Sequence, residues 1–193
     1  MIQRSLVLLK PDAVQRGIAG EILARFERAG LKIVGAKLIN VDKNVVKKHY
    51  KKDAEWHKMI GGYSLRDCEK YGISAMEHFG TENAEEIGKE INSWLYDMMS
   101  MGPVFAFVLK GPGAVSKIRK LVGNTYPDEA EPGTIRGDFG LDSVFSSMKR
   151  KRSVLNLIHA SGTPEEAEDE IKMWFTNEEL VDYKRSHEDI YSY

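Results

Sequence analysis

A histidine that closes a short apolar segment is the residue best suited to chemistry in this chain. His159 follows Val-Leu-Asn-Leu-Ile, and the small residues Ala-Ser-Gly come directly after it. Small residues at such a turn leave room for a substrate beside the imidazole. An imidazole is a good nucleophile and is largely unprotonated near neutral pH. The pattern therefore favours a histidine that itself attacks a substrate, and the alternative is a packed or solvated histidine.

The remaining histidines lie in charged, helix-like or terminal surroundings and have no such clearing after them. They are predicted to be structural: His49, His57, His78 and His187.

A carboxylate follows the histidine at helical spacing. Thr163 is predicted to cap a helix that begins at Pro164, with Glu166 completing a capping box. Glu170 is about two turns past the cap, on the side of the helix that faces His159. It could accept the Nδ1–H of His159 and leave Nε2 free to attack. The alternative is a solvated glutamate on a helix surface.

A long loop rich in glycine and proline, residues 123–139, carries groups that suit an anionic ligand. Thr125 and Arg136 lie in it, and Arg119 precedes it on a predicted helix. Guanidinium groups match the geometry of phosphate oxygens. With Lys10 at another strand end, these groups predict phosphoryl transfer through a phosphohistidine. Taken singly, Arg119 and Lys10 are as well explained as surface charges.

Length and composition predict one globular domain over residues 1–193. The chain is 42% hydrophobic and 30% charged, with a net charge of −1. Cys68 is the only cysteine, and no segment resembles a signal peptide or a membrane span, so a cytoplasmic protein without a membrane partner is expected. The near-neutral charge argues against nucleic acid as a partner, and the basic run 149–152 is predicted to be a solvated loop.

Hydrophobic periodicity predicts a ferredoxin-like α+β sandwich of order β-α-β-β-α-β, an antiparallel sheet with helices packed on one face. The predicted strands cover residues 5–10, 32–40, 104–109 and 154–160. The predicted helices cover residues 20–29, 43–51, 114–122 and 163–175.

Two segments of the chain are additional to this order of strands and helices. Residues 52–91 are predicted to form a helical insertion between the second and third strands, and residues 141–153 are a second expansion.

Blocks spread along nearly the whole chain resemble the nucleoside diphosphate kinases, in that family's order. They include Lys10-Pro-Asp-Ala-Val-Gln-Arg-Gly17, His49-Tyr50, Gly123-Asn-Thr125, Pro132-Gly-Thr-Ile-Arg-Gly-Asp-Phe139 and Asn156-Leu-Ile-His-Ala-Ser161. The resemblance implies a ping-pong exchange of the γ-phosphate between nucleoside triphosphates and diphosphates, with His159 as the phosphorylated residue.

The resemblance also implies the other parts of the site. It assigns catalytic roles to His159, Glu170, Lys10 and Tyr50. It assigns nucleotide contacts to Lys10, Tyr50, Trp56, Leu95, Arg119, Thr125, Arg136 and Asn156. Mg²⁺ is expected to be bound mainly through the nucleotide phosphates, with no metal ligand from the protein. A homo-oligomer is expected, a hexamer in preference to a tetramer.

The chain departs from the family pattern at three places. Gly162 stands where the family commonly has Asp. The expansion over 52–91 leaves the aromatic base platform open, and the expansion over 141–153 leaves the other wall of the base site open. Counting forward from Tyr50 gives Trp56, whereas counting backward from Gly102 gives Ile91. Trp56 is preferred because Ile91 has the spacing of a helix core. The alternative function is a catalytically silent regulatory or nucleic-acid-binding protein of the same fold.

Overall fold

The computed structural model describes residues 1–50 and 53–186, which contain one antiparallel sheet of four strands. The strand order is β2-β3-β1-β4. The strands are β1 (Ile2–Leu9), β2 (Lys32–Ile39), β3 (Val104–Pro112) and β4 (Ile158–Ala160). With its helices, this sheet confirms the ferredoxin-like α+β architecture.

The central strand β1 is buried on both faces. Val7 and Leu9 point into one hydrophobic cluster, and Leu6 and Leu8 point into another. This alternation is the period of two that a strand imposes on its side chains. Because both clusters need a cover, helices lie on both faces of the sheet, and the expectation of a single helical face is wrong.

The first face is covered by α2 (Ala19–Arg28) and α7 (Ala114–Val122), with the short α1 (Pro11–Gln15) at the end of β1. Phe26 and Ile118 are fully buried there. Gly30 follows α2 with a φ of 84°, a left-handed conformation that glycine adopts without strain. It therefore ends the helix as its position in the sequence predicts.

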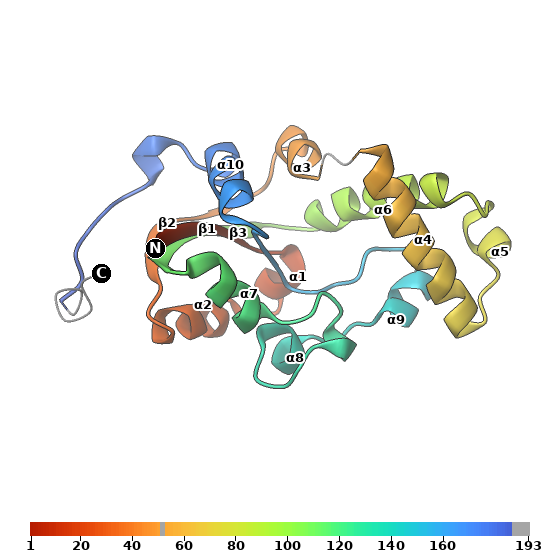
Figure 1. Ribbon diagram of the computed structural model, residues 1–193, viewed down its shortest axis with the longest axis horizontal. Coiled ribbons are helices and arrows are strands. Elements are labelled where there is room, and N and C mark those ends of the chain that lie inside the picture. The colour runs from red at the N-terminus through yellow and green to blue at the C-terminus, as the bar shows by residue number, and fades with distance from the viewer. Residues whose placement is uncertain (51–52, 187–193) are drawn as a thin grey trace.

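The opposite face is covered by α10 (Pro164–Trp174), α3 (Lys43–His49) and the end of α6 (Ala84–Met99), as Figure 1 shows. Ile171, Val46 and Met99 are almost fully buried in this cluster. Glu170 of α10 and His49 of α3, discussed below, lie on this face, whereas Arg119 lies on α7 of the first face.

The predicted insertion between β2 and β3 is helical. It consists of α4 (Ala54–Tyr71), α5 (Ala75–Phe79) and α6, which extend beyond the sheet in Figure 1. In the second expansion, α9 (Val144–Lys149) packs on α4 through a small cluster that includes Cys68 and Met148. The two expansions therefore support each other.

Several details differ from the predicted boundaries: β1 begins three residues earlier than expected and β3 ends three residues later. The helix expected over 43–51 ends at His49, and residue 51 lies outside the described part of the chain. The strand expected over 154–160 is shorter, because a tight turn at Leu157 separates residues 154–157 from β4. The loop 123–139 contains a 3-10 turn (Pro127–Glu129) and the helix α8 (Ile135–Phe139). A second 3-10 turn (Asn177–Glu179) follows α10.

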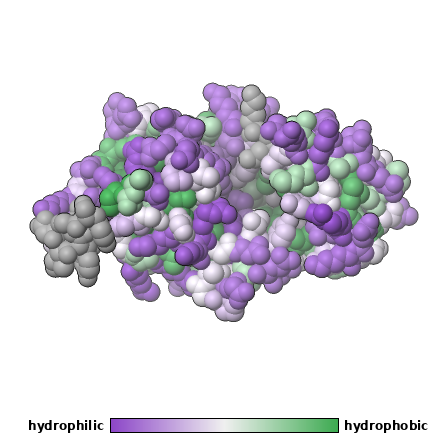
Figure 2. All heavy atoms as spheres, viewed as in Figure 1, coloured by the Kyte–Doolittle hydropathy of each residue, from purple (hydrophilic) through white to green (hydrophobic). Residues whose placement is uncertain are grey.

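The surface carries mostly hydrophilic residues on the face shown in Figure 2, with hydrophobic residues in small patches. Within residues 1–50 and 53–186, no helix combines the length and apolar character needed to cross a membrane.

Candidate active site

His159 lies in β4 directly after a strained turn. It pairs with Leu8 of β1 in the sheet register. The turn is centred on Leu157, whose φ of 70° is unfavourable for a residue with a Cβ atom. The Leu157 N–H donates to Oδ2 of the buried Asp12 at 3.0 Å, and its carbonyl accepts the Lys10 N–H at 2.8 Å. These contacts stabilise the unfavourable backbone conformation of Leu157 and fix the position at which β4 begins.

Glu170 of α10 meets His159 as predicted, but at the other ring nitrogen. Its two carboxylate oxygens lie 2.9 and 3.0 Å from Nε2 of His159. The expectation of a bond to Nδ1 is wrong, because α10 packs across the sheet and brings the carboxylate to the Nε2 side of the ring. The Ser161 hydroxyl donates to the same carboxylate at 2.7 Å. A neutral His159 held in this way carries its proton on Nε2 and its lone pair on Nδ1.

The start of α10 is capped in a slightly different way from the prediction. Thr163 Oγ1 accepts the Glu166 N–H at 3.1 Å, as expected for the cap. The Glu166 carboxylate, however, accepts the N–H of Gly162 at 2.7 Å, one residue before the cap. A Cβ atom at Gly162 would lie 2.6 Å from that carboxylate oxygen. The glycine therefore fits the local arrangement that leads into α10.

Sequence reasoning missed His49, which the structure places against His159. The two ring centroids are 4.5 Å apart, and the rings are nearly perpendicular at 84°. Nδ1 of His49 accepts the indole N–H of Trp174 at 3.3 Å. The His49 side chain comes from α3, which is distant from β4 in the sequence, so spacing gives no signal. The one signal available is the His49-Tyr50 block of the family resemblance.

Four of the predicted residues form one connected network beside His159. The Lys10 ammonium donates to Asn156 Oδ1 at 2.6 Å. The Asn156 amide donates to the Thr125 carbonyl at 2.9 Å, and Arg136 Nε donates to the Asn156 carbonyl at 3.1 Å. The end of β1, the long loop and the segment before β4 therefore meet at Asn156.

Arg136 is committed mainly to backbone carbonyls. Besides Asn156, its guanidinium donates to the carbonyls of Gly123, Asn124 and Ile158 at 2.7–3.1 Å. Four of its five N–H groups are thereby used, and one has no partner among the described residues. Burial, with the nearby Arg119 charge, lowers the pKa of Arg136 to about 10, so it remains charged at neutral pH.

Two further predicted residues are buried with unusual electrostatics. Burial and the neighbouring Arg136 charge lower the pKa of Lys10 to about 7, with Asp12 acting in the opposite direction. Burial raises the pKa of Tyr50, and the Glu170 carboxylate adds to that effect. The Tyr50 hydroxyl is buried and has no hydrogen-bond partner in the described part of the chain. An orphaned hydroxyl near these charges suits a ligand oxygen.

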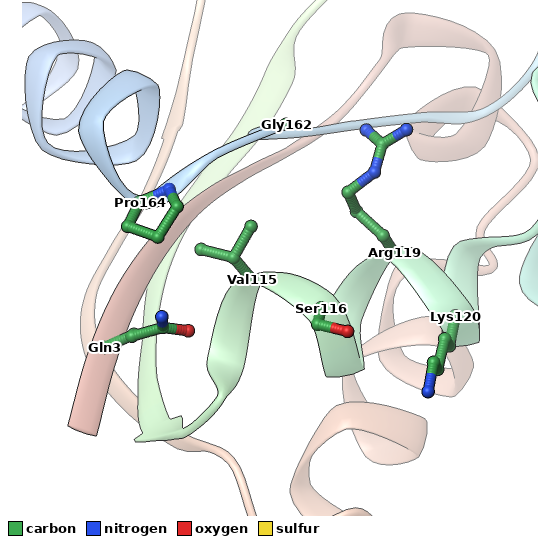
Figure 3. Close-up of a pocket in the computed structure, with 7 residues that line it drawn as sticks. All are labelled: Gln3, Val115, Ser116, Arg119, Lys120, Gly162 and Pro164. Atoms are coloured by element: carbon green, nitrogen blue, oxygen red, sulfur yellow. The ribbon is translucent and has the colours of Figure 1, made fainter. Parts of the chain in front are cut away.

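Arg119 lies on α7 and lines a pocket of about 470 Å³ next to the start of α10. Figure 3 shows its side chain directed toward the segment at Gly162, whereas Lys120 points away from that segment. Its guanidinium makes no hydrogen bond or ion pair within the described residues. Arg119 therefore differs from Arg136, because its donors remain available to an anion.

The two residues proposed for the base lie outside this network. Trp56 is half-buried in the first turn of α4, with its ring 5.6 Å from that of His57. Leu95 of α6 packs against the hydrophobic cluster that contains Tyr50. Ile91, the competing platform residue, is also half-buried on α6.

One group of side chains could present donor atoms to a metal ion. His49, His159 and Glu170 place theirs within 4.8 Å of one another. Two imidazoles and one carboxylate do not suit Mg²⁺, which prefers oxygen ligands. The hydrogen bonds of Glu170 already account for the arrangement. This group therefore does not fit Mg²⁺.

Comparison with known proteins gives consistent matches along the chain. A family model described as nucleoside diphosphate kinase matches residues 3–60 and 69–180. A nucleoside diphosphate kinase of Pyrobaculum aerophilum is 43% identical over 181 residues, which cover 94% of this chain and 99% of the relative. One of Borreliella burgdorferi is 36% identical, over 97% of this chain and 96% of the relative.

Two solved structures are similar in fold as well as in sequence. The crystal structure of an NDP kinase from Pyrobaculum aerophilum has a TM-score of 0.91 at 42% identity, covering 94% of this chain and all of that one. A transition-state mimic of the nucleoside-diphosphate kinase from Borrelia burgdorferi, with bound vanadate and ADP, has a TM-score of 0.75 at 37% identity. It covers 97% of this chain and 95% of that one.

Proposed function

The chain belongs to the nucleoside diphosphate kinase family, and from that premise we propose that His159 carries the phosphoryl group of the family's reaction on Nδ1. The reaction moves the γ-phosphate of a nucleoside triphosphate to a nucleoside diphosphate through a phosphohistidine. The observation that supports Nδ1 is the contact between Glu170 and Nε2, which leaves the lone pair of His159 on the other nitrogen.

Each half-reaction is balanced without a separate base. In the first, Nδ1 of His159 attacks the γ-phosphorus, the bond from phosphorus to the β,γ-bridging oxygen breaks, and the diphosphate leaves with that electron pair. The ring becomes cationic because it keeps its Nε2 proton. The Glu170 carboxylate stabilises this charge and fixes the tautomer, as in triad chemistry. In the second, a terminal phosphate oxygen of another nucleoside diphosphate attacks the phosphohistidine and restores the neutral ring.

Cationic side chains would stabilise the negative charge on the transferring phosphoryl group. Arg119 can offer its whole guanidinium, and Arg136 can add one N–H while it holds the loop in place. Lys10, Tyr50 and Thr125 would contact phosphate or sugar oxygens, and Asn156 a sugar hydroxyl. Such preorganised donors act most strongly on charge that develops in the transition state.

Mg²⁺, when bound on the nucleotide phosphates, would supply further charge neutralisation.

We also infer a homo-oligomer, a hexamer in preference to a tetramer, and a cytoplasmic location. β2 lies at the edge of the sheet and carries Leu38, which is 61% exposed, and this supports assembly through an interface. Sedimentation of the purified protein would give the number of subunits.

The proposal is tested by an exchange assay that converts ATP and a second nucleoside diphosphate into ADP and the corresponding triphosphate. The wild-type protein is expected to be active, and His159→Ala inactive. His78→Ala, on the helical insertion, is the matched control and should retain exchange. An inactive wild-type protein would instead favour the alternative, a silent regulatory or nucleic-acid-binding protein of the same fold.

A further inference from the structure

His49 lies at the centre of a group of rings behind the reactive histidine. Its side chain is almost completely buried. Its ring centroid lies 4.5 Å from that of His159, 4.7 Å from that of Tyr50 and 5.5 Å from that of Trp174. All three pairs are nearly perpendicular, an arrangement favoured by aromatic quadrupoles. His49 is therefore packed where it can restrict the orientation of the His159 ring.

The partner of His49 on α10 determines where its proton lies. The indole nitrogen of Trp174 can only donate a hydrogen bond, and it lies 3.3 Å from Nδ1 of His49. Nδ1 must then present a lone pair to the indole N–H. A neutral His49 consequently carries its proton on Nε2.

The position of that proton matters for Glu170. Nδ1 of His49 lies 3.5 Å from Oε1 of Glu170, and the same oxygen lies 2.9 Å from Nε2 of His159. With a lone pair on Nδ1, His49 cannot donate to the carboxylate. With a proton on Nδ1, it would compete for Glu170 with the Nε2–H of His159 and the hydroxyl of Ser161.

We propose that His49 is a positioning residue, which Trp174 holds in the Nε2–H tautomer so that Glu170 stays available to orient His159. This inference rests on the proposed function and adds a residue pair to it. The titratable groups that face His49 are Glu170 of α10, His159 of β4 and Tyr50. His49 acts through Glu170 and His159 and does not itself react.

The kinetic test compares ring-preserving and acceptor-preserving variants. His49→Phe keeps a ring but leaves the Trp174 N–H without an acceptor, whereas His49→Asn places an amide oxygen near the position of Nδ1. Trp174→Phe removes the donor alone. At metal-bound histidines, loss of such a supporting partner typically costs about 10–100-fold. We expect a comparable loss in the rate of His159 phosphorylation for both Phe variants, partial recovery in His49→Asn, and a KM for the nucleotide within about twofold of the wild-type value.

Matched controls separate this effect from a general loss of packing. Trp94→Phe and His78→Asn change the same residue types on the helical insertion, where Trp94 stacks on Phe79, and should leave the phosphorylation rate unchanged. Wild-type turnover by His49→Phe would overturn the proposal.

The first arm of a spectroscopic test uses only the wild-type protein. In wild-type protein labelled with ¹⁵N-histidine, the His49 signals should show an unprotonated Nδ1 and a protonated Nε2. In Trp174→Phe, the proton should move at least partly to Nδ1. A protonated Nδ1 in the wild-type protein would overturn the inference even if exchange activity is present. A wild-type protein without exchange activity would instead contradict the proposed function.

Discussion

The Glu170 carboxylate accepts hydrogen bonds from two side chains, His159 and Ser161. Glu170→Gln retains one oxygen acceptor, but the new amide group can only donate, and the charge that stabilises the phosphorylated ring is lost. Hydrogen bonds to charged groups contribute roughly 1.5–3 kcal/mol. We therefore expect the phosphorylation rate, measured by rapid quench with labelled ATP, to fall about ten- to hundredfold. Glu165→Gln, on the exposed first turn of the same helix, is the control.

Lys10 makes the stability of the fold depend on pH. Its pKa is about 7 in the folded protein, below the usual value of about 10.4 for lysine in an unfolded chain. Between these values the unfolded chain binds more protons, so the contribution of Lys10 to the free energy of unfolding rises with pH. Below pH 7 both states are protonated, and the cost of burying the charge is at its maximum.

Replacement of Lys10 by Met should therefore stabilise the protein most near pH 6.5 and progressively less up to pH 10. The measurement is urea unfolding of Lys10→Met and the wild-type protein across this range. Lys172→Met removes a charge whose side chain is 75% exposed and serves as the control. A difference between Lys10→Met and wild type that stays constant with pH would contradict the assignment.

The sequence predicted which side chains of the site lie close together better than it predicted which of their atoms are in contact. The spacing from Thr163 to Glu170 gives the side of the helix that faces His159, but not the angle at which α10 crosses the sheet. That angle decides which nitrogen Glu170 contacts. His49 could not be predicted from spacing, because α3 and β4 are brought together only by tertiary packing. Arg136 was predicted to bind phosphate. Its hydrogen bonds to loop carbonyls could not be predicted, because they depend on the folded path of that loop.

Among the elements, α4 and α6 approach each other at two glycines. A Cβ atom at Gly61 would lie 1.8 Å from the Ala84 carbonyl oxygen, and one at Gly88 would lie 2.0 Å from the His57 carbonyl oxygen. Either Gly→Ala change must push the helices apart, so we expect a clear loss of thermal stability. Gly62→Ala is the control, because nothing lies within 4 Å of its Cβ position. Alanine in a helix interior is favoured over glycine by roughly 0.5–1 kcal/mol, so Gly62→Ala should stabilise.

Equal stability of Gly61→Ala and Gly62→Ala would contradict the close packing of α4 and α6.

The helical character of the insertion that contains α4 and α6 could be predicted from its periodicity, and α7 was predicted with its observed bounds. The close contact between α4 and α6 could not, since it depends on two residues without side chains. The shortened β4 could not be predicted either, because an apolar run gives no sign of the turn that Asp12 holds at Leu157.

Across the whole molecule, the insertion is connected to the site by a chain of polar contacts. The Asn92 amide of α6 contacts His57 of α4 at 3.2 Å and the Tyr96 hydroxyl at 3.1 Å. The Tyr96 hydroxyl in turn donates to the Tyr50 carbonyl at 3.4 Å. The insertion is therefore placed where it can form a wall of the nucleotide site, with Trp56 and Ile91 as the two candidates for the base.

Trp56 remains our prediction for the base platform. Loss of an aromatic stacking partner costs roughly 1–3 kcal/mol per base, so Trp56→Ala should weaken ADP binding, measured by calorimetry, by about 5- to 150-fold. In a protein with Trp94 and Trp174 replaced by Phe, the remaining Trp56 emission should be quenched by nucleotide. Unchanged affinity and emission, together with weakened binding in Ile91→Ala, would assign the platform to Ile91.

The reaction mechanism as a whole depends on which atom receives the phosphate. The most direct measurement is to react the protein with ATP, without acceptor, and identify the phosphorylated residue and ring nitrogen by mass spectrometry and phosphorus NMR. We predict an acid-labile phosphate on Nδ1 of His159, with its transfer to an added nucleoside diphosphate. Phosphate on Nε2, or on another residue, would contradict the mechanism derived from the Glu170 contact.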